Sequence, residues 1–226
     1  MNSEVKKMTK YKYAIFDLDG TLFDTITDIM NSGNELLETY DKPPFGLTDF
    51  KQFVGLGVKK MIGELIQKGG IRESDIDTLT EKYLGIYRRR MLEETTLYPG
   101  IQDLLVALKD EGIKLAVLSN KPQEDVDHLL EEFRMNDQFA FVMGKKPEYP
   151  IKPDPSSLKA VMSAMQASQT EVVFIGDTKT DIETAKNAKV TSIGVTWGFR
   201  PYQELETAGA DHIVDKPDQI LQIVKG

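Results

Sequence analysis

Two aspartates follow the first apolar run of the chain, in residues 16–24, which read FDLDGTLFD. If the chain is still extended there, Asp17 and Asp19 point to the same side, because strand side chains alternate with a period of two. Two carboxylates so close repel each other unless a cation or a proton intervenes. A turn in which Asp24 or Thr25 caps the next helix would also explain acidic residues at this place. The segment therefore predicts either carboxylate chemistry or an ordinary turn.

A second acidic pair follows another apolar run, in residues 172–181, VVFIGDTKTD. Asp177 stands at the expected strand end, and the spacing of Thr180 and Glu183 predicts a capping box with a helix starting near Thr180. Asp181 then fits a first-turn acid as well as a functional one. Carboxylate and carbonyl oxygens are the ligands that Mg²⁺ prefers, and no histidine or cysteine accompanies the two acidic strand ends. The pattern therefore indicates Mg²⁺.

Two further segments offer groups that bind anions. Ser119 and Asn120 follow the apolar residues 114–118, and the backbone entering a helix near Pro122 would form an anion cradle. Lys152 lies in the segment Lys-Pro-Asp-Pro, where the following proline favours an extended backbone. Taken singly, the first segment also fits a plain helix start, and the lysine also fits a solvated surface amine.

The apolar pattern predicts an α/β fold that positions these groups. Short runs without polar alternation are typical of strands buried on both faces of a parallel sheet, and helical periods lie between them. The expected strands are Tyr11–Phe16, Lys114–Leu118, Glu171–Ile175 and Thr191–Val195, with weaker candidates at Phe139–Met143 and His212–Val214. We expect a doubly wound, mostly parallel, Rossmann-like sheet. Ligands bind outside the carboxyl ends of strands in such sheets.

One stretch breaks the alternation of strands and helices. Residues 24–98 carry helical periods and no convincing strand, and a structureless loop of that length is abnormal in a compact domain. We expect an inserted helical cap domain at 24–98, with a catalytic core formed by residues 1–23 and 99–226.

Composition narrows the classes of function. The 226 residues have 28 Lys and Arg against 36 Asp and Glu, a net charge of −8 that argues against broad binding to nucleic acid or membranes. Without cysteine, disulfides and thiolate chemistry are excluded, and two histidines make a multi-histidine metal site improbable. No run approaches the roughly 20 apolar residues of a membrane span, and no signal peptide is evident. We expect a cytoplasmic protein.

Together the four segments resemble the motifs of the haloacid dehalogenase-like hydrolase superfamily. Residues 17–24 match its Asp-x-Asp-Gly-Thr-Leu-x-Asp, and Gly-Asp-x-x-x-Asp matches residues 176–181; Ser119 and Lys152 match the two motifs between them. The helical insertion is similar to the cap of its phosphoglycolate phosphatase and β-phosphoglucomutase branch. One departure is Ala188-Lys189, where the family usually has Ala-Gly, which puts the local turn in doubt.

The resemblance implies a role for each residue. Asp17 would be the nucleophile that forms an aspartyl-phosphate, and Asp19 the general acid and base. Mg²⁺ would be held by the Asp17 carboxylate, the Asp19 backbone carbonyl and Asp177. Ser119, Asn120 and Lys152 would bind the phosphoryl oxygens. Asp181 would order a metal-bound water or orient Lys152. An acid two residues after the nucleophile marks phosphate-ester chemistry in this family, so Asp19 argues against dehalogenation.

The expected function is a Mg²⁺-dependent phosphatase acting on a small phosphate ester, phosphoglycolate-like or a sugar phosphate. A phosphosugar mutase is the alternative, and a non-enzymatic phosphoacceptor module a more distant one. Lys59 or Lys60 would pair with a substrate anion or lie on a solvated helix face, and Arg88 to Arg90 are expected to be exposed. The sequence leaves the oligomeric state open between monomer and homodimer.

Overall fold

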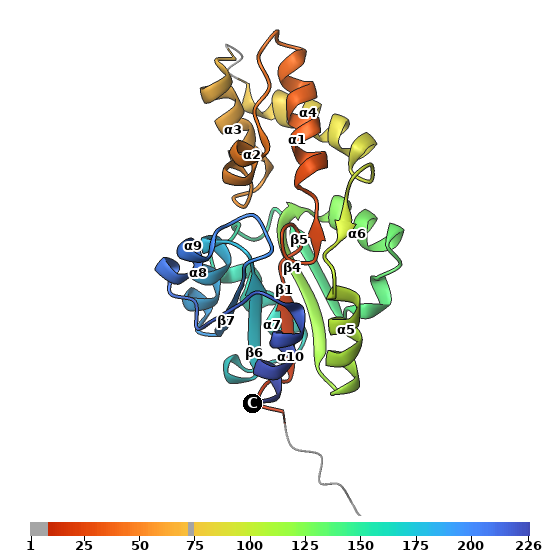
Figure 1. Cartoon of the computed structure of the whole chain (residues 1–226), viewed down its shortest axis with the longest axis vertical. Coiled ribbons are helices and arrows are strands. Elements are labelled where there is room, and N and C mark those ends of the chain that lie inside the picture. The colour runs from red at the N-terminus through yellow and green to blue at the C-terminus, as the bar shows by residue number, and fades with distance from the viewer. Residues whose placement is uncertain (1–8, 72–74) are drawn as a thin grey trace, which may run out of the picture.

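A six-stranded parallel sheet forms the centre of the computed structural model, which describes residues 9–71 and 75–226. The strand order is β5-β4-β1-β6-β7-β8, so β1 lies between β4, which carries Ser119, and β6, which is followed by Asp177 (Figure 1). The strands are β1 Tyr13–Phe16, β4 Lys114–Pro122, β5 Phe141–Lys145, β6 Val172–Gly176, β7 Thr191–Val195 and β8 His212–Val214. The predicted parallel α/β architecture is confirmed.

Helices cover both faces of this sheet because alternate strand residues point to opposite sides. Ala14 and Phe16 of β1 pack in the apolar cluster that includes α5, α6 and α10, whereas Tyr13 and Ile15 pack in the cluster that includes α7 and α8. The helices here are α5 Ile101–Asp110, α6 Gln123–Glu132, α7 Ser156–Ala164, α8 Lys179–Ala188, α9 Tyr202–Ala208 and α10 Pro217–Lys225, with 3₁₀ turns at Asn136–Gln138 and Gln169–Glu171. Apolar side chains on both faces thus fix the sheet.

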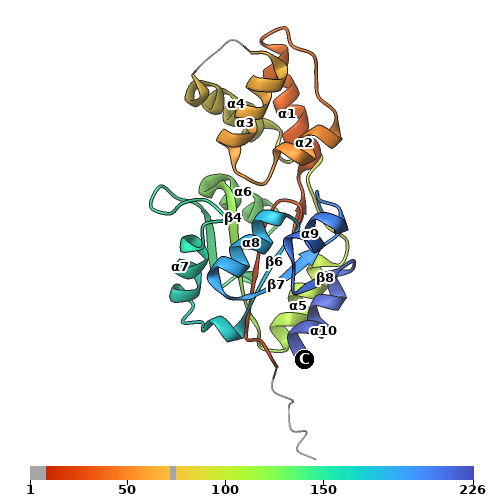
Figure 2. The same cartoon turned by 90° about the vertical axis from the view of Figure 1, so that its left-hand side faces the viewer.

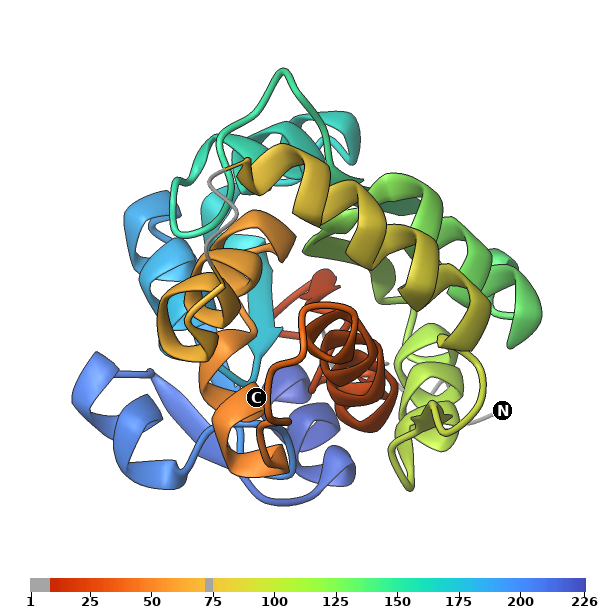
Figure 3. The same cartoon turned by 90° about the horizontal axis from the view of Figure 1, so that it is seen from above.

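The first four helices of the described chain, α1 to α4, stand together beyond the carboxyl ends of the strands (Figures 1 and 2). They are α1 Ile26–Glu38, α2 Leu47–Phe53, α3 Val58–Gly69 and α4 Ile76–Arg90, called the helical layer below. A Cβ at Gly33 of α1 would lie 2.4 Å from the Phe50 ring of α2, so glycine allows these helices to pack closely. Seen from above, the helical layer lies over the sheet (Figure 3).

The segments that connect the helical layer to the sheet form a small ladder that the sequence did not predict. Strands β2 (Phe23–Asp24) and β3 (Thr96–Leu97) pair antiparallel, with Phe23 opposite Leu97. Two-residue strands carry too little periodicity to be detected in a sequence. None of the helices in the described residues has the length and hydropathy needed to span a membrane.

Two details of α8 differ from the sequence analysis. The N-cap is Thr178 rather than Thr180, and the reciprocal partner in the capping box is Asp181 rather than Glu183. At the other end Lys189 adopts the left-handed conformation, with φ of 60°, where a glycine was expected. The turn therefore forms as it would with glycine, with a lysine in a conformation that costs a side chain roughly 1 kcal/mol.

Candidate active site

Two acidic strand ends meet because β1 and β6 are neighbours in the sheet. Asp17 follows β1, and its N–H continues the strand ladder by donating to the Ile175 carbonyl at 2.8 Å. Asp177 directly follows β6 and is fully buried. On its way from β1 to the helical layer the chain turns sharply at Gly20, where φ is +80°. A Cβ at this position would lie 2.3 Å from Asp177 Oδ2. Only glycine fits this turn against the second aspartate.

Lys152 lies at the centre of the buried charges and not at the surface. Its side chain is 2% exposed; its ammonium lies 2.9 Å from Asp17 Oδ1 and 2.7 Å from Asp181 Oδ1, and also donates to the Leu118 carbonyl at 3.3 Å. Asn120 holds the lysine backbone from both sides, since its Oδ1 accepts from Lys152 N at 2.8 Å and its Nδ2 donates to Lys152 O at 3.2 Å. The Asn120 side chain therefore positions the lysine.

Asp181 both caps α8 and contacts Lys152. Its Oδ2 accepts hydrogen bonds from Thr178 N at 3.1 Å and Thr178 Oγ1 at 2.6 Å, which caps α8. Its Oδ1 faces Lys152. The cap fixes the carboxylate, and the carboxylate orients the ammonium that contacts Asp17.

Burial controls the protonation of this cluster. Desolvation raises the pKa of Asp17 to about 7, against the opposing charge of Lys152. Desolvation also raises the pKa of Asp177 well above its ordinary value, although Phe199 N donates to its Oδ2 at 2.7 Å. Burial by itself would lower the pKa of Lys152, but the charges of Asp17 and Asp181 outweigh it and raise the pKa. The lysine is therefore protonated throughout the ordinary pH range.

The cluster has the composition of a cation site. One carboxylate oxygen from each of Asp17, Asp177 and Asp181 lies within 4.8 Å of the others. Three buried carboxylates face one lysine, and such an excess of negative charge is costly without a further cation. Oxygen ligands at this spacing fit a hard divalent cation.

Asp19 faces the same cavity as Asp17, but its carboxylate is held by different groups. Its Oδ1 accepts from Thr25 Oγ1 at 2.7 Å and lies 3.0 Å from the ammonium of Lys121. Thr25 was expected only as a helix cap, and the role of Lys121 was missed. The one available signal for Lys121 was its position two residues after the motif serine, just beyond the predicted strand Lys114–Leu118.

The remaining predicted residues line one cavity between the strand ends and the helical layer. Ser119 is buried there, and its Oγ accepts from Lys121 N at 3.2 Å. The whole lining comprises Asp17, Asp19, Ile29, Val54, Gly55, Gly57, Val58, Met61, Tyr83, Tyr87, Ser119, Asn120, Lys121, Pro122, Asp125, Thr178 and Phe199. Lys59 and Lys60 are absent from this lining; they are 55% and 61% exposed and pair with Asp77 and Glu64. The solvated-face alternative for both lysines is therefore the correct one.

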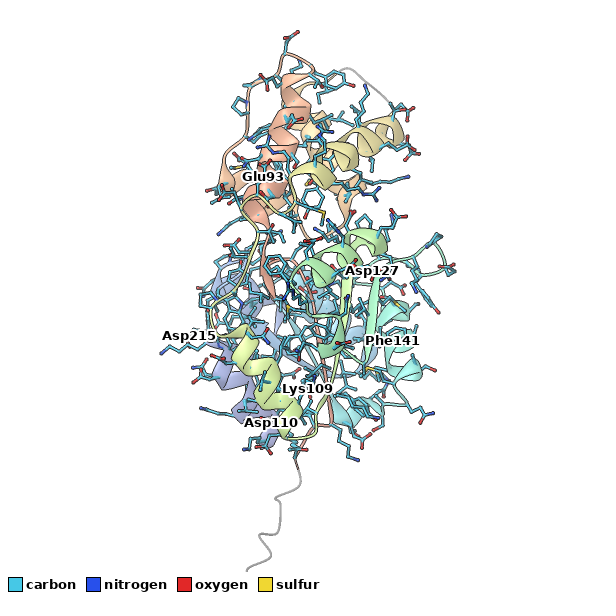
Figure 4. All side chains as sticks on the ribbon, turned by 90° about the vertical axis from the view of Figure 1, so that its right-hand side faces the viewer. Glu93, Lys109, Asp110, Asp127, Phe141 and Asp215 are labelled. Carbon is cyan, nitrogen blue, oxygen red and sulfur yellow. The ribbon has the colours of Figure 1, made fainter. Side chains whose placement is uncertain are left out.

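Several polar links tie the helical layer to the segments around the sheet. Arg88 Nε of α4 lies 2.8 Å from Asp125 Oδ1 of α6, the helix that carries the labelled Asp127 just below the helical layer in Figure 4. Asn120 Nδ2 donates to Gly55 O at 3.0 Å, and Arg200 Nη2 donates to Val54 O at 2.7 Å. Arg88 is exposed, as expected, at 45% of its side-chain area, but α6 supplies a buried carboxylate partner for it from a distant part of the sequence, which the sequence did not predict.

Comparison with known proteins agrees with this geometry. The family model of haloacid dehalogenase-like hydrolases matches residues 14–195. The phosphoglycolate phosphatase of Pseudomonas putida is 30% identical over 208 residues, which cover 90% of this chain and 76% of that protein. Phosphoglycolate phosphatase 1 of Pseudomonas aeruginosa is 31% identical over 227 residues, covering 94% and 82%.

Solved structures with the same fold include two members of the branch indicated by the sequence. A protein from Lactobacillus delbrueckii subsp. bulgaricus, provisionally named a phosphoglycolate phosphatase, superposes with a TM-score of 0.90 at 31% identity, covering 96% of this chain and 99% of the other. One from Thermotoga maritima, provisionally named a β-phosphoglucomutase, gives 0.75 at 26% identity, covering 95% and 98%. The chain therefore belongs to the haloacid dehalogenase-like hydrolases and is a phosphoric monoester hydrolase similar to the phosphoglycolate phosphatases.

Proposed function

We propose that this chain is a Mg²⁺-dependent phosphatase that hydrolyses a small phosphorylated metabolite through an aspartyl-phosphate on Asp17. The metabolite is phosphoglycolate-like or a sugar phosphate. The observation that carries the proposal is the position of Asp17: it lines the cavity, contacts Lys152 at 2.9 Å, and has Asp177 on one side and Asp19 two residues along the chain. A nucleophile, a buried cation and a second acid thus share one site.

The reaction would proceed in two steps. In the first, a carboxylate oxygen of Asp17 attacks phosphorus, the bond from phosphorus to the ester oxygen breaks, and Asp19 gives a proton to the leaving oxygen. In the second, water attacks the phosphorus of the acyl phosphate while Asp19 takes its proton. Inorganic phosphate leaves and the Asp17 carboxylate is restored. Thr25 and Lys121 hold the Asp19 side chain at the cavity for both proton transfers.

Ser119, the backbone near Asn120, and Lys152 would bind the three phosphoryl oxygens. Ser119 and Asn120 line the cavity, and the lysine ammonium already contacts the nucleophile. Donors fixed before the substrate arrives stabilise the charge that develops on these oxygens. Asp181 and the Asn120 side chain act through the lysine, by fixing its ammonium and its backbone.

Mg²⁺ would be held by the carboxylates of Asp17 and Asp177 and by the backbone carbonyl of Asp19. When bound, it offsets the repulsion between the phosphate and the attacking carboxylate. The buried excess of negative charge around Asp177 supports this assignment.

The helical layer would act as the cap that covers the substrate, with 24–98 as the cap domain and 1–23 with 99–226 as the catalytic core. Its residues form much of the cavity lining, which supports a role in shielding the reaction from water. A cytoplasmic location and the absence of nucleic-acid partners stay predictions from the sequence, and the oligomeric state is open.

A phosphosugar mutase is the second candidate, favoured by the similarity to the Thermotoga maritima structure. Incubation with a hexose 1-phosphate separates the two, since a mutase yields the 6-phosphate and a phosphatase yields inorganic phosphate. The non-enzymatic phosphoacceptor alternative is not retained, because the chain is a phosphatase.

The proposed function is tested with Asp17→Asn. Release of inorganic phosphate from phosphoglycolate and from sugar phosphates, with and without Mg²⁺, is expected to fall at least ~10³-fold in this variant, because the nucleophile is lost. Acid quenching is expected to trap labelled phosphate on the wild-type protein and to trap none on the Asp17→Asn variant. Asp103→Asn, an exposed acid on α5, is the matched control and should keep the wild-type rate. Turnover that survives Asp17→Asn would refute the role of Asp17.

A further inference from the structure

The connection between β7 and α9, residues 196–201, contacts the turn that follows β1. It is fixed at its start, where Thr196 N donates to the Val214 carbonyl of β8 at 3.0 Å. Near its end, Arg200 Nε lies 3.2 Å from Glu204 Oε1 of α9. Because both ends are tied to the sheet domain, the central residues of the connection are held in a fixed place.

At the centre of this connection, Gly198 lies directly against the turn and against Asp177. A Cβ at residue 198 would stand 2.3 Å from the Gly20 carbonyl oxygen and 2.5 Å from Asp177 Oδ2. Neither distance leaves room for a side chain, so glycine is what allows the backbone to approach so closely. The connection therefore touches both the turn that carries the Asp19 carbonyl and the carboxylate of Asp177.

Phe199, the next residue, holds one oxygen of Asp177. Its N–H donates to Asp177 Oδ2 at 2.7 Å, and the Asp177 side chain is fully buried. Among the described residues, Thr21 Oγ1 donates to the other oxygen, Oδ1, at a longer 3.4 Å. A hydrogen bond from a fixed backbone group orients a carboxylate and leaves its second oxygen to a cation.

Trp197 holds the turn from the opposite side of Gly198. Its indole Nε1 donates to the Thr21 carbonyl at 3.1 Å, and its partly buried ring packs against the apolar cluster that includes α5, α6 and α10. An aromatic ring is sufficient for this packing, whereas the N–H is directional and fixes the peptide group two residues after Asp19. Trp197 thus adds to its apolar contact a hydrogen bond that core packing does not require.

We infer that Trp197 is a positioning residue of the cation site. Its indole N–H and the Phe199 N–H hold the turn after β1 and the Asp177 carboxylate against each other, and so set the affinity for Mg²⁺. The inference rests on the proposed function, in which Asp177 and the Asp19 carbonyl hold the cation. Three buried carboxylates repel one another in the absence of a cation, so donors outside the cluster are needed to keep its geometry. Trp197 does not line the cavity and acts through the turn.

The test measures the binding of Mn²⁺ without substrate. Mn²⁺ takes the same oxygen ligands as Mg²⁺, and the EPR signal of free Mn²⁺ falls as the ion binds. Dissociation constants are determined for the wild type, Trp197→Phe, Asp177→Asn and Tyr202→Phe, and Mg²⁺ is added in competition to obtain its own constant. Trp197→Phe removes the N–H and keeps an aromatic ring. Tyr202→Phe, at a tyrosine that is 50% exposed at the start of α9, is the matched control.

We expect the dissociation constant to rise about 10-fold in Trp197→Phe, the usual effect of removing a group that orients a metal ligand. Asp177→Asn should raise it about 100-fold, because a ligand is lost, and Tyr202→Phe should leave it at the wild-type value. A wild-type constant in a folded Trp197→Phe protein would overturn the inference while the cation site stands. An unchanged constant in Asp177→Asn would instead overturn the proposed Mg²⁺ site.

A second variant keeps the test decisive if Trp197→Phe does not fold. Trp197 is the only tryptophan of the chain, so biosynthetic replacement of tryptophan by benzothienylalanine changes this position alone. Sulfur then takes the place of the indole N–H in a ring of nearly the same shape. The Mn²⁺ constant should again rise about 10-fold, with the metal-free melting temperature within about 2 °C of the wild type. An unchanged Mn²⁺ constant would refute the inference, and a large fall in the metal-free melting temperature would make the role of the indole N–H purely structural.

Discussion

The two sides of the cavity are built in different ways. On the sheet side, charged groups come from strand ends and the segments that follow them, and each of Asp17, Asp181 and Lys152 contacts another of the three. On the helical side the lining is mostly apolar, and its polar hydroxyl at Tyr87 has no hydrogen-bond partner in the described chain. The charged groups are held by contacts with one another and have an excess of negative charge that a cation would balance, whereas the helical side has a buried hydroxyl without a partner in the described chain.

This difference suits the sheet side to carrying out the reaction and the helical side to selecting the substrate. Backbone ladders fix the strand ends, so the groups on them are held rigidly enough for a reaction that depends on placement. Helices α1–α4 touch the sheet side through a small number of polar links, such as Arg200 to Val54. Changes on the sheet side should therefore alter the rate and the metal requirement, and changes on the helical side should alter the affinity and choice of substrate.

Among the substitutions that test this difference between the two sides, Asp177→Asn is expected to have the largest effect. The substitution removes one of two carboxylates proposed to hold Mg²⁺, so the Mg²⁺ concentration for half-maximal activity should rise about 100-fold. A titration of phosphate release against Mg²⁺ measures the shift. Asp215→Asn, an exposed acid on the sheet domain, is the control and should leave the titration in place. An unchanged titration for Asp177→Asn would place the metal elsewhere.

The sequence predicts the sheet side well because its groups follow strand ends. Buried apolar runs locate the strands, and parallel topology brings their carboxyl ends to one edge, so the residue pattern alone is enough to place Asp17, Ser119 and Asp177 together. The prediction erred where a choice depended on one or two residues: α8 starts at Lys179 with Thr178 as cap, and Asp181 serves as both cap partner and lysine partner.

The helical side could not be predicted in the same way. Whether a lysine on a helix faces the cavity or the solvent depends on how the helices pack, and Lys59 and Lys60 face the solvent. The role of Lys121 depends on the extension of β4 to Pro122, which places the ammonium beside Asp19. Contacts between residues 102 positions apart leave no local periodicity that a single sequence could reveal.

A smaller effect is expected from Arg200→Ala, which removes a contact between the sheet side and the helical side. Arg200 donates to the carbonyls of Gln52 and Val54, and Val54 lines the cavity. Without these hydrogen bonds the loop after α2 loses its anchor on the sheet side, and we expect KM to rise about 10-fold, with kcat within about 2-fold. Arg89→Ala is the control, because Arg89 pairs with Glu35 inside the helical layer. A kcat that falls with KM unchanged would contradict the separation of the two sides.

The smallest effect expected is on stability, from Asp17→Asn in the absence of metal. Burial raises the pKa of Asp17 to about 7 from 3.8, so the folded state binds this proton more tightly than the unfolded chain. Its contribution to the free energy of unfolding is therefore fully present below about pH 4 and is lost as the pH rises through about 7.

At pH 8 the variant, which carries no charge at this position, should melt about 4 °C above the wild type. The gap should close below about pH 4 and narrow when Mg²⁺ stabilises the wild type. Equal melting temperatures at pH 8 would mean that Lys152 fully compensates the buried charge, and that the sheet side stores no strain for catalysis.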